Sequence, residues 1–167
     1  MSSYICFPRN IINKNLIQVG KNCRIGKCGV MEEITKNGAQ NFYPTIILDD
    51  DVYEGRYCQL YCVDSVRIGD GFVLSEYVYI SDSAHGFDPY GGWIMQHALE
   101  SKGSISIRKN FRRLWGFYHA RTDARKKMHR RTRSVVTKSF SPYTMLAASP
   151  AKIIKSFDFE SGKWIPV

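Results

Sequence analysis

The stretch VRIGDGFVLSEYVYISD, residues 66–82, repeats its apolar residues at a step of six. Two interlaced rows run through it: Val66, Phe72 and Val78, then Ile68, Leu74 and Ile80. An α-helix would place apolar residues three and four apart, whereas these residues alternate with polar ones, as in a strand, and the pattern restarts after six. The stretch therefore predicts short strands joined by tight corners.

A parallel β-solenoid accounts for this rhythm, because each hexad can form one flat side of a coil and point its aliphatic residue into a narrow interior. The same step separates Val19-Gly20 from Ile25-Gly26, where glycine suits the backbone of a corner. An antiparallel β-sandwich also alternates apolar and polar residues, but it has no reason to keep a fixed step. We therefore expect an all-β fold made of parallel coils.

The length of 167 residues is that of one domain with a sizeable core. No apolar run approaches the length of a membrane span, and the N-terminus MSSYICFPRN lacks the apolar centre of a signal peptide. We expect a single domain over residues 1–167, no membrane span and a cytoplasmic location. The five cysteines are an odd number and lack zinc-pair spacing, so we expect buried thiols and no metal.

Two longer segments resemble a known family. RIGDGFVLSEYVYISDSAHGFDP (67–89) and SVVTKSFSPYTMLAASPAKIIKSF (134–157) are similar to the hexapeptide-repeat acyltransferases, in particular sugar O-acetyltransferases of the galactoside, maltose and lipopolysaccharide or capsule type. The resemblance covers residues 15–107 and 134–167. It implies a left-handed parallel β-helix over 15–107 and 134–150, an active-site loop at 81–103 that protrudes after the His85 strand, and a C-terminal tail at 151–167.

The positive charge of the chain is confined to one segment. The formal net charge is +9, but residues 108–133 hold 11 of the 24 Lys and Arg and one of the 15 acidic residues, so the remainder is close to neutral. A basic insertion could be a nucleic-acid arm or a solvated loop. We favour neither, and expect no nucleic-acid partner, because a shifted reading frame accounts for the segment.

Reading each codon of this segment from its second base yields sequences compatible with ordinary hexads. In that frame Trp115-Gly116 must give glycine, Met128-His129 must give cysteine, and aliphatic residues fall at four positions six apart, those of Arg112, Tyr118, Ala124 and Arg130. The next step of six lands on Val136 in the written frame. We therefore predict that residues 108–133 are frameshifted coils in which glycine codons are read as arginine.

Acetyl transfer to a hydroxyl requires a base, and histidine suits that role near neutral pH. His119 and His129 lie in the frameshifted segment, and His97 matches no motif and is expected to be structural. The resemblance places the catalytic base at His85, in SDSAHGFDP. Asp82 and Asp88 flank it, and each is expected either to orient the imidazole or meet a sugar hydroxyl, or to cap a turn.

The resemblance also implies an acetyl-CoA donor and a sugar acceptor. Gln59 is expected to face the acceptor. The residues expected to contact CoA are Ser134, Thr137, Lys152 and Lys155. Ala148 stands where the family more often has glycine.

These expectations together predict an acetyl-CoA-dependent O-acetyltransferase of surface-polysaccharide sugars, such as those of lipopolysaccharide or capsule. The resemblance implies a homotrimer with the site between subunits. N-acetylation of an amino sugar remains open, as does a non-enzymatic β-solenoid that binds a partner through residues 108–133.

Overall fold

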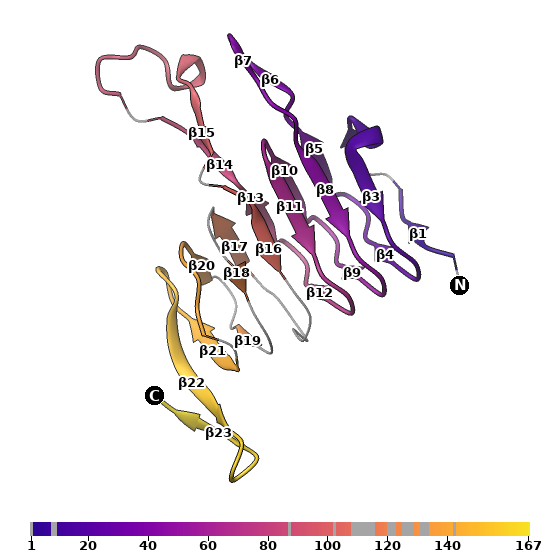
Figure 1. Ribbon diagram of the computed structural model, residues 1–167, viewed down its shortest axis with the longest axis vertical. Coiled ribbons are helices and arrows are strands. Elements are labelled where there is room, and N and C mark those ends of the chain that lie inside the picture. The colour runs from indigo at the N-terminus through magenta and orange to yellow at the C-terminus, as the bar shows by residue number, and fades with distance from the viewer. Residues whose placement is uncertain are drawn as a thin grey trace.

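The structure is a computed structural model, and it describes residues 2–7, 10–86, 88–101, 103–107, 116–119, 123–124, 129–130, 134–141 and 143–167. Its strands visit three parallel sheets in rotation, which is the solenoid expected from residues 66–82 (Figure 1). The first sheet contains β1 (Tyr4–Ile5), β4 (Arg24–Ile25), β9 (Tyr53–Glu54) and β12 (Val73–Leu74).

The second and third sheets complete the coils. The second contains β2 (Asn10–Ile12), β5 (Val30–Glu33), β10 (Gln59–Cys62), β13 (Tyr79–Ser81), β17 (Gly116–His119) and β20 (Ser134–Val136). The third contains β3 (Ile17–Val19), β8 (Thr45–Leu48), β11 (Ser65–Ile68), β16 (Ile105–Ile107) and β18 (Asp123–Ala124). The parallel pairing of β1 with β4 and of β2 with β5 shows that the coils begin before residue 15, the start expected from sequence.

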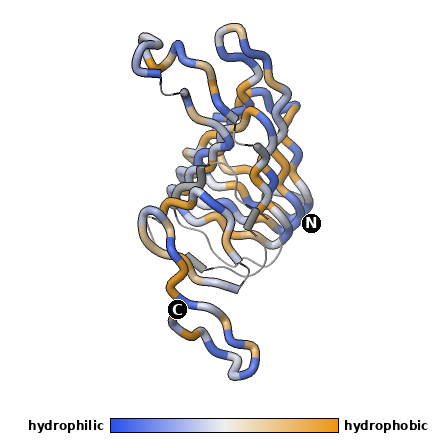
Figure 2. The backbone as a smooth tube through the Cα atoms, turned by 60° about the vertical axis from the view of Figure 1, so that its left-hand side comes forward, coloured by the Kyte–Doolittle hydropathy of each residue, from blue (hydrophilic) through white to orange (hydrophobic). Residues whose placement is uncertain are grey.

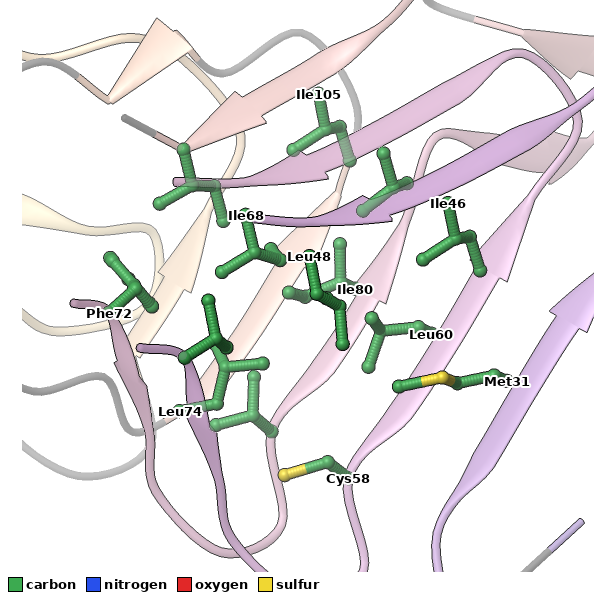
Figure 3. Packing of buried hydrophobic residues seen from close by; sticks show 14 of the residues in the cluster. Met31, Ile46, Leu48, Cys58, Leu60, Ile68, Phe72, Leu74, Ile80 and Ile105 are labelled. Carbon is green, nitrogen blue, oxygen red and sulfur yellow. The ribbon is translucent and has the colours of Figure 1, made fainter. Parts of the chain in front are cut away.

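The interior is a column of aliphatic side chains stacked in register from coil to coil. Ile46 pairs with Val66, which pairs with Ile105, and all three are fully buried. Figure 3 shows such side chains pointing into the space enclosed by the strands. Figure 2 shows the matching alternation of apolar and polar residues along the coils. Removing this apolar area from water is the main favourable term for the fold.

One corner of each coil is wider than the hexad rhythm predicts. A coil without an insertion takes twenty residues, the separation of Ile46 from its register partner Val66, whereas three hexads would take eighteen. The step of six holds from Val66 to Phe72 to Val78, which are all buried. The two additional residues fall between the second and third sheets, where Val63 and Asp64 separate β10 from β11. We call this the wide corner.

Two insertions leave the solenoid at the wide corner. The hairpin of β6 (Lys36–Asn37) and β7 (Gln40–Asn41) follows β5, and the antiparallel arm of β14 (Ser83–His85) and β15 (Leu99–Ser101) follows β13. Both project from the same edge of the solenoid, at the top of Figure 1. The arm lies within the 81–103 loop expected from sequence and carries the 3-10 helix η2 (Ile94–Gln96), while η1 (Lys14–Leu16) precedes β3.

The C-terminal part departs from the parallel pattern. Strand β19 (His129–Arg130) pairs in parallel with β21 (Thr144–Ala147), and β21 then pairs antiparallel with β22 (Lys152–Asp158), which pairs antiparallel with β23 (Lys163–Pro166). The tail expected at 151–167 is therefore a β-hairpin. Edge-to-face contacts link its rings, with Phe157 5.1 Å from Phe159 and 5.3 Å from Trp164 between ring centroids.

The described strands of the basic segment pair in parallel with ordinary coils. Tyr118 is in register with Ile80 and Val136, Ala124 with Ile107, and Arg130 with Leu146. These are three of the four backbone positions at which the shifted frame supplies aliphatic residues. Arg112, the fourth, lies outside the described residues. The frameshift itself stays a prediction.

The five cysteines are free thiols. Cys23, Cys58 and Cys62 are buried as expected, whereas Cys28 is exposed. Among the described residues, no group of His, Cys, Asp or Glu side chains could hold a metal ion, and no helix is long and apolar enough to cross a membrane.

Glu33 has a buried carboxyl group without a hydrogen-bond partner among the described residues. Burial raises the pKa of this group from 4.5 to about 7. Between those values the unfolded chain releases the proton and the folded chain keeps it. The free energy of unfolding should therefore fall by about 3 kcal/mol as the pH rises from about 4.5 to about 7. Glu33→Gln should flatten this slope in urea unfolding series, whereas Glu160→Gln, on an exposed turn, should keep it; equal slopes in all three proteins would contradict the assignment.

The frameshift prediction is tested on recombinant chains. A chain recoded in the shifted frame across residues 111–133 should unfold at a higher temperature than the written chain, because aliphatic residues would occupy the inward positions. Differential scanning calorimetry of both chains measures this. Peptide mass spectrometry of the protein from its source then identifies the frame that is translated. A recoded chain that melts at or below the temperature of the written chain would refute the prediction.

Candidate functional site

His85 ends strand β14, at the point where the arm opens into its loop. It pairs with Leu99 across the arm, and its imidazole is partly buried. The Nδ1 atom lies 3.5 Å from the backbone carbonyl oxygen of His97. In the tautomer that carries its proton on Nδ1, this contact leaves Nε2 as an acceptor, which is the arrangement a general base needs.

The β6–β7 hairpin holds the arm through side-chain amides. The Leu99 N–H donates to Gln40 Oε1 at 2.7 Å, and Gln40 Nε2 donates to the Leu99 carbonyl at 3.1 Å. Asn37 Nδ2 donates to the His97 carbonyl at 3.2 Å, the same oxygen that faces His85. We call these contacts the amide clamp. It joins residues about sixty positions apart in sequence and fixes the strand opposite His85.

Asp82 lies on the inner side of the wide corner and is fully buried. Its Oδ1 accepts the N–H of Val63 at 2.9 Å, and its Oδ2 accepts the N–H of Asp64 at 2.8 Å. The Cys62 thiol lies 3.4 Å from the same Oδ2, and burial together with this carboxylate raises the pKa of the thiol. The sequence left two roles open for Asp82, one at the imidazole or the sugar and one as a turn cap. In the structure its carboxylate caps the turn formed by Val63 and Asp64.

Asp88 also binds a local amide, but it is exposed at the mouth of the loop. Its Oδ1 accepts the N–H of Tyr90 at 2.9 Å, and its backbone carbonyl accepts the N–H of Gly91 at 3.0 Å. The loop borders an open cavity of about 380 Å³ lined by Gly86, Asp88, Gly91, Gln96, His97, Ala98 and Glu100. Asp88 is thus the sequence-predicted residue that the structure places on this cavity.

His97 was expected to be structural, and its hydrogen bond is of that kind, although the residue also lines the pocket. Its Nδ1 donates to the Gly86 carbonyl at 2.7 Å, which joins the two ends of the loop. The sequence signal that could have indicated it was weak, since no motif surrounds it and the contact joins residues eleven apart through the fold. Another expected residue, Gln59, lies on the outer face of β10 and is in register with Tyr79, at the other end of β13 from the arm.

The residues expected to contact CoA lie at the C-terminal end of the solenoid. Ser134 is buried at the start of β20, Thr137 is exposed just after it, and Lys152 is exposed at the start of β22. Backbone bonds connect these segments, because the Ala151 N–H donates to the Val135 carbonyl at 2.8 Å. Lys155 follows on β22, in register with Met145.

Ala148 adopts a backbone conformation for which glycine is better suited. Its φ is +81°, in the left-handed region that a residue with a Cβ rarely adopts. The Ala148 carbonyl accepts the N–H of Val135 at 3.3 Å. This conformation therefore belongs to the turn between β21 and β22, which lies against β20.

Comparisons with known proteins show similarity at the level of the fold. No family model matches the chain, and no curated protein matches it. The solved structure of AntD, an N-acyltransferase from Bacillus cereus in complex with dTDP and 3-hydroxybutyryl-CoA, aligns with 95% of this chain and 82% of its own, at 14% identity and a TM-score of 0.77. A variant of AntD in complex with dTDP-4-amino-4,6-dideoxyglucose and coenzyme A aligns with 96% of this chain and 85% of its own, at 12% identity and a TM-score of 0.74.

The amide clamp predicts a measurable effect on the arm. Gln40→Ala removes both hydrogen bonds to Leu99. Because each such bond stabilises the closed arm by about 1 kcal/mol, the Leu99 amide should exchange its hydrogen about tenfold faster or more. Hydrogen exchange of a peptide that includes Leu99 measures this. Asn41→Ala, on the exposed side of the same hairpin, is the matched control and should leave exchange unchanged. Unchanged exchange in Gln40→Ala would contradict the clamp.

Proposed function

We propose that the protein is an acetyl-CoA-dependent O-acetyltransferase of a sugar. The observation that carries this proposal is the geometry of His85, whose Nδ1 faces a backbone carbonyl on an arm that the amide clamp holds. The resemblance of SDSAHGFDP to the hexapeptide-repeat acyltransferases supports it, and so does the fold similarity to AntD, a protein crystallised with acyl-CoA and nucleotide ligands.

In this mechanism Nε2 of His85 accepts the proton of a sugar hydroxyl as its oxygen attacks the thioester carbonyl of acetyl-CoA. The new C–O bond forms a tetrahedral intermediate, and backbone N–H groups would stabilise its oxyanion. Collapse of the intermediate breaks the C–S bond and releases the CoA thiolate, which takes a proton from the imidazolium. Histidine can serve as both base and acid in this sequence.

Asp82 has a supporting role in the proposal. Its carboxylate accepts two backbone N–H groups of the preceding coil, so it anchors the base of β14 and contributes to His85 through the backbone. Asp88 is proposed to meet the acceptor, and Gln59 remains a further acceptor-contact proposal. Ser134, Thr137, Lys152 and Lys155 are proposed to contact CoA.

The proposal includes a homotrimer, because these CoA-contacting residues lie at the C-terminal end of the coils and His85 lies on the arm. A neighbouring subunit would bring the two together. The left-handed sense of the coils, a cytoplasmic location and a role in lipopolysaccharide or capsule synthesis belong to the same proposal.

A second candidate is N-acylation of an amino sugar. It is favoured by the fold similarity to AntD, an N-acyltransferase whose structure includes dTDP-4-amino-4,6-dideoxyglucose. The product distinguishes the two reactions, because mild alkali hydrolyses an O-acetyl ester and leaves an N-acetyl amide intact. The non-enzymatic alternative predicts binding through residues 108–133 that weakens steeply with salt and no CoA release.

Substitution of His85 tests the proposal. The chain, as written and recoded across 111–133, is assayed for release of CoA from acetyl-CoA with a panel of free sugars and nucleotide sugars. His85→Ala should lower kcat by about 100-fold or more, the usual contribution of a general base. The control is Asn41→Ala, which should retain full activity. Turnover that survives His85→Ala would exclude the mechanism, and a folded recoded chain that releases no CoA with any acceptor would exclude the enzyme class tested.

A further inference from the structure

We propose that Glu33 is a pH-sensitive switch for the arm. In its protonated form the carboxyl group keeps the wide corner closed, and loss of the proton releases the β6–β7 hairpin and, through the amide clamp, the arm. This inference goes beyond the proposed function, because it concerns the movement of the arm whatever reaction takes place there. It depends on the burial of Glu33, on the groups around it and on its short connection to the hairpin.

The carboxyl group of Glu33 lies in the interior of the solenoid. Glu33 is the last residue of β5, and its side chain is buried on the same face of the strand as that of Met31. Neither Oε1 nor Oε2 has a hydrogen-bond partner among the described residues. A buried carboxylate without a partner is far costlier than the neutral acid. The closed corner therefore favours the protonated form, in agreement with the raised pKa of this group.

Inside the corner, the groups stacked near Glu33 are acidic or neutral. Cys62 on β10 is in register with Glu33, and its thiol lies 3.4 Å from Oδ2 of Asp82 in the next coil. The strands paired with β5, which are β2 and β10, contain no Lys, Arg or His, and neither do β3 and β8 of the third sheet. These strands therefore offer no cation to an ionised Glu33.

The charged groups outside the corner do not compensate for this. Glu32 points to the outer face of β5, and its negative charge raises the pKa of Glu33 further. Tyr61 is in register with Glu32. The basic residues nearest in the chain, Lys14 and Lys36, are exposed. An ionised Glu33 would therefore gain stabilising partners by reaching water at the surface of the corner.

Glu33 lies directly before the connection to the β6–β7 hairpin. Only Ile34 and Thr35 separate it from β6. Two hydrogen bonds hold this connection to the coils, from Asn13 Nδ2 to the Glu33 carbonyl at 2.7 Å and from the Ile34 N–H to the Cys62 carbonyl at 2.8 Å. Movement of the carboxylate toward water displaces the end of β5 and with it the base of the hairpin.

The amide clamp transmits this displacement to the arm. Asn37, on β6, donates to the His97 carbonyl, and Gln40, on β7, binds both backbone groups of Leu99. Leu99 pairs with His85 across the arm. A hairpin that moves away from the coils therefore frees the strand opposite His85.

Proton linkage gives the direction of the effect. In the open form the carboxyl group of Glu33 is solvated and has its ordinary pKa of 4.5, whereas in the closed form its pKa is about 7. Below the lower value both forms keep the proton, and the closed form has its full stability. Between the two values opening releases a proton, so the opening equilibrium rises by up to about tenfold for each pH unit. Above the higher value both forms are ionised and the equilibrium no longer changes.

Hydrogen exchange of the full chain tests the switch at about pH 5 and about pH 7. Each rate is divided by that of an unstructured reference peptide at the same pH, because exchange itself is faster at higher pH. Protection of the Leu99 amide should fall about tenfold or more between these pH values. Protection of β9 and β12, in the first sheet, should stay above that of Leu99 at both. Constant protection of Leu99, or protection of Leu99 that always equals that of the first sheet, would overturn the proposal.

Two variants assign the response to Glu33. Glu33→Gln has nearly the shape of the protonated acid and cannot ionise, so protection of Leu99 should be the same at both pH values. Glu32→Gln is the matched control. It should keep the fall in protection and move it to lower pH, because it removes a charge that raises the pKa of Glu33. A tenfold fall that persists in Glu33→Gln would refute the switch, and the comparison within the parent chain does not depend on either variant.

His85→Ala distinguishes this inference from the proposed function. Because His85 is itself a titratable group of the arm, its removal shows whether the response comes from the wide corner. The variant should keep the fall in Leu99 protection although it has lost acetyl transfer. Loss of the fall in His85→Ala would refute the assignment to Glu33. Retained acetyl transfer would refute the proposed mechanism and leave the switch unaffected.

Discussion

The buried carboxylate of Asp82 secures the wide corner on which the rest of the site depends. It accepts the N–H groups of Val63 and Asp64, the two residues by which a coil exceeds three hexads. Hydrogen bonds to a charged acceptor are worth about 1.5–3 kcal/mol each, and buried N–H groups without partners would cost a similar amount. The carboxylate therefore compensates for the irregular corner while its own backbone leads directly into β14 and His85. One residue links the stability of the solenoid to the position of the arm.

The same corner explains why a rigid solenoid can carry a precisely placed loop. The β6–β7 hairpin and the arm both leave at this corner, and parallel register stacks their starting points along one edge of the fold. Gln40 then binds both backbone groups of Leu99, as a neighbouring strand would. The arm is held at its base by Asp82 and along its strand by Gln40. A functional group on such a support is better fixed than one on a loop with free sides.

The sequence predicted those features that depend on short-range periodicity. Residues 66–82 predicted alternating inward rows, and the coils follow because the aliphatic residues of those rows are all buried in the interior of the solenoid. The amide clamp was not predictable, since the side chains of Asn37 and Gln40 bind backbone groups of a different insertion, which they meet only when the coils stack. The first coil was missed because residues 4–12 lack the step of six, although their backbone pairs in register with β4 and β5.

The strand register of residues 108–133 supports the shifted frame as the origin of their positive charge. Tyr118, Ala124 and Arg130 occupy backbone positions paired with Ile80, Ile107 and Leu146, which are fully buried. A solenoid interior takes aliphatic residues at such positions, because neighbouring coils share one narrow column and unpaired charge there is costly. Hexads in the shifted frame provide aliphatic residues at all three. The six-residue rhythm of residues 66–82 and the in-register pairing of the coils thus point to the same reading of the segment, and neither depends on its charge.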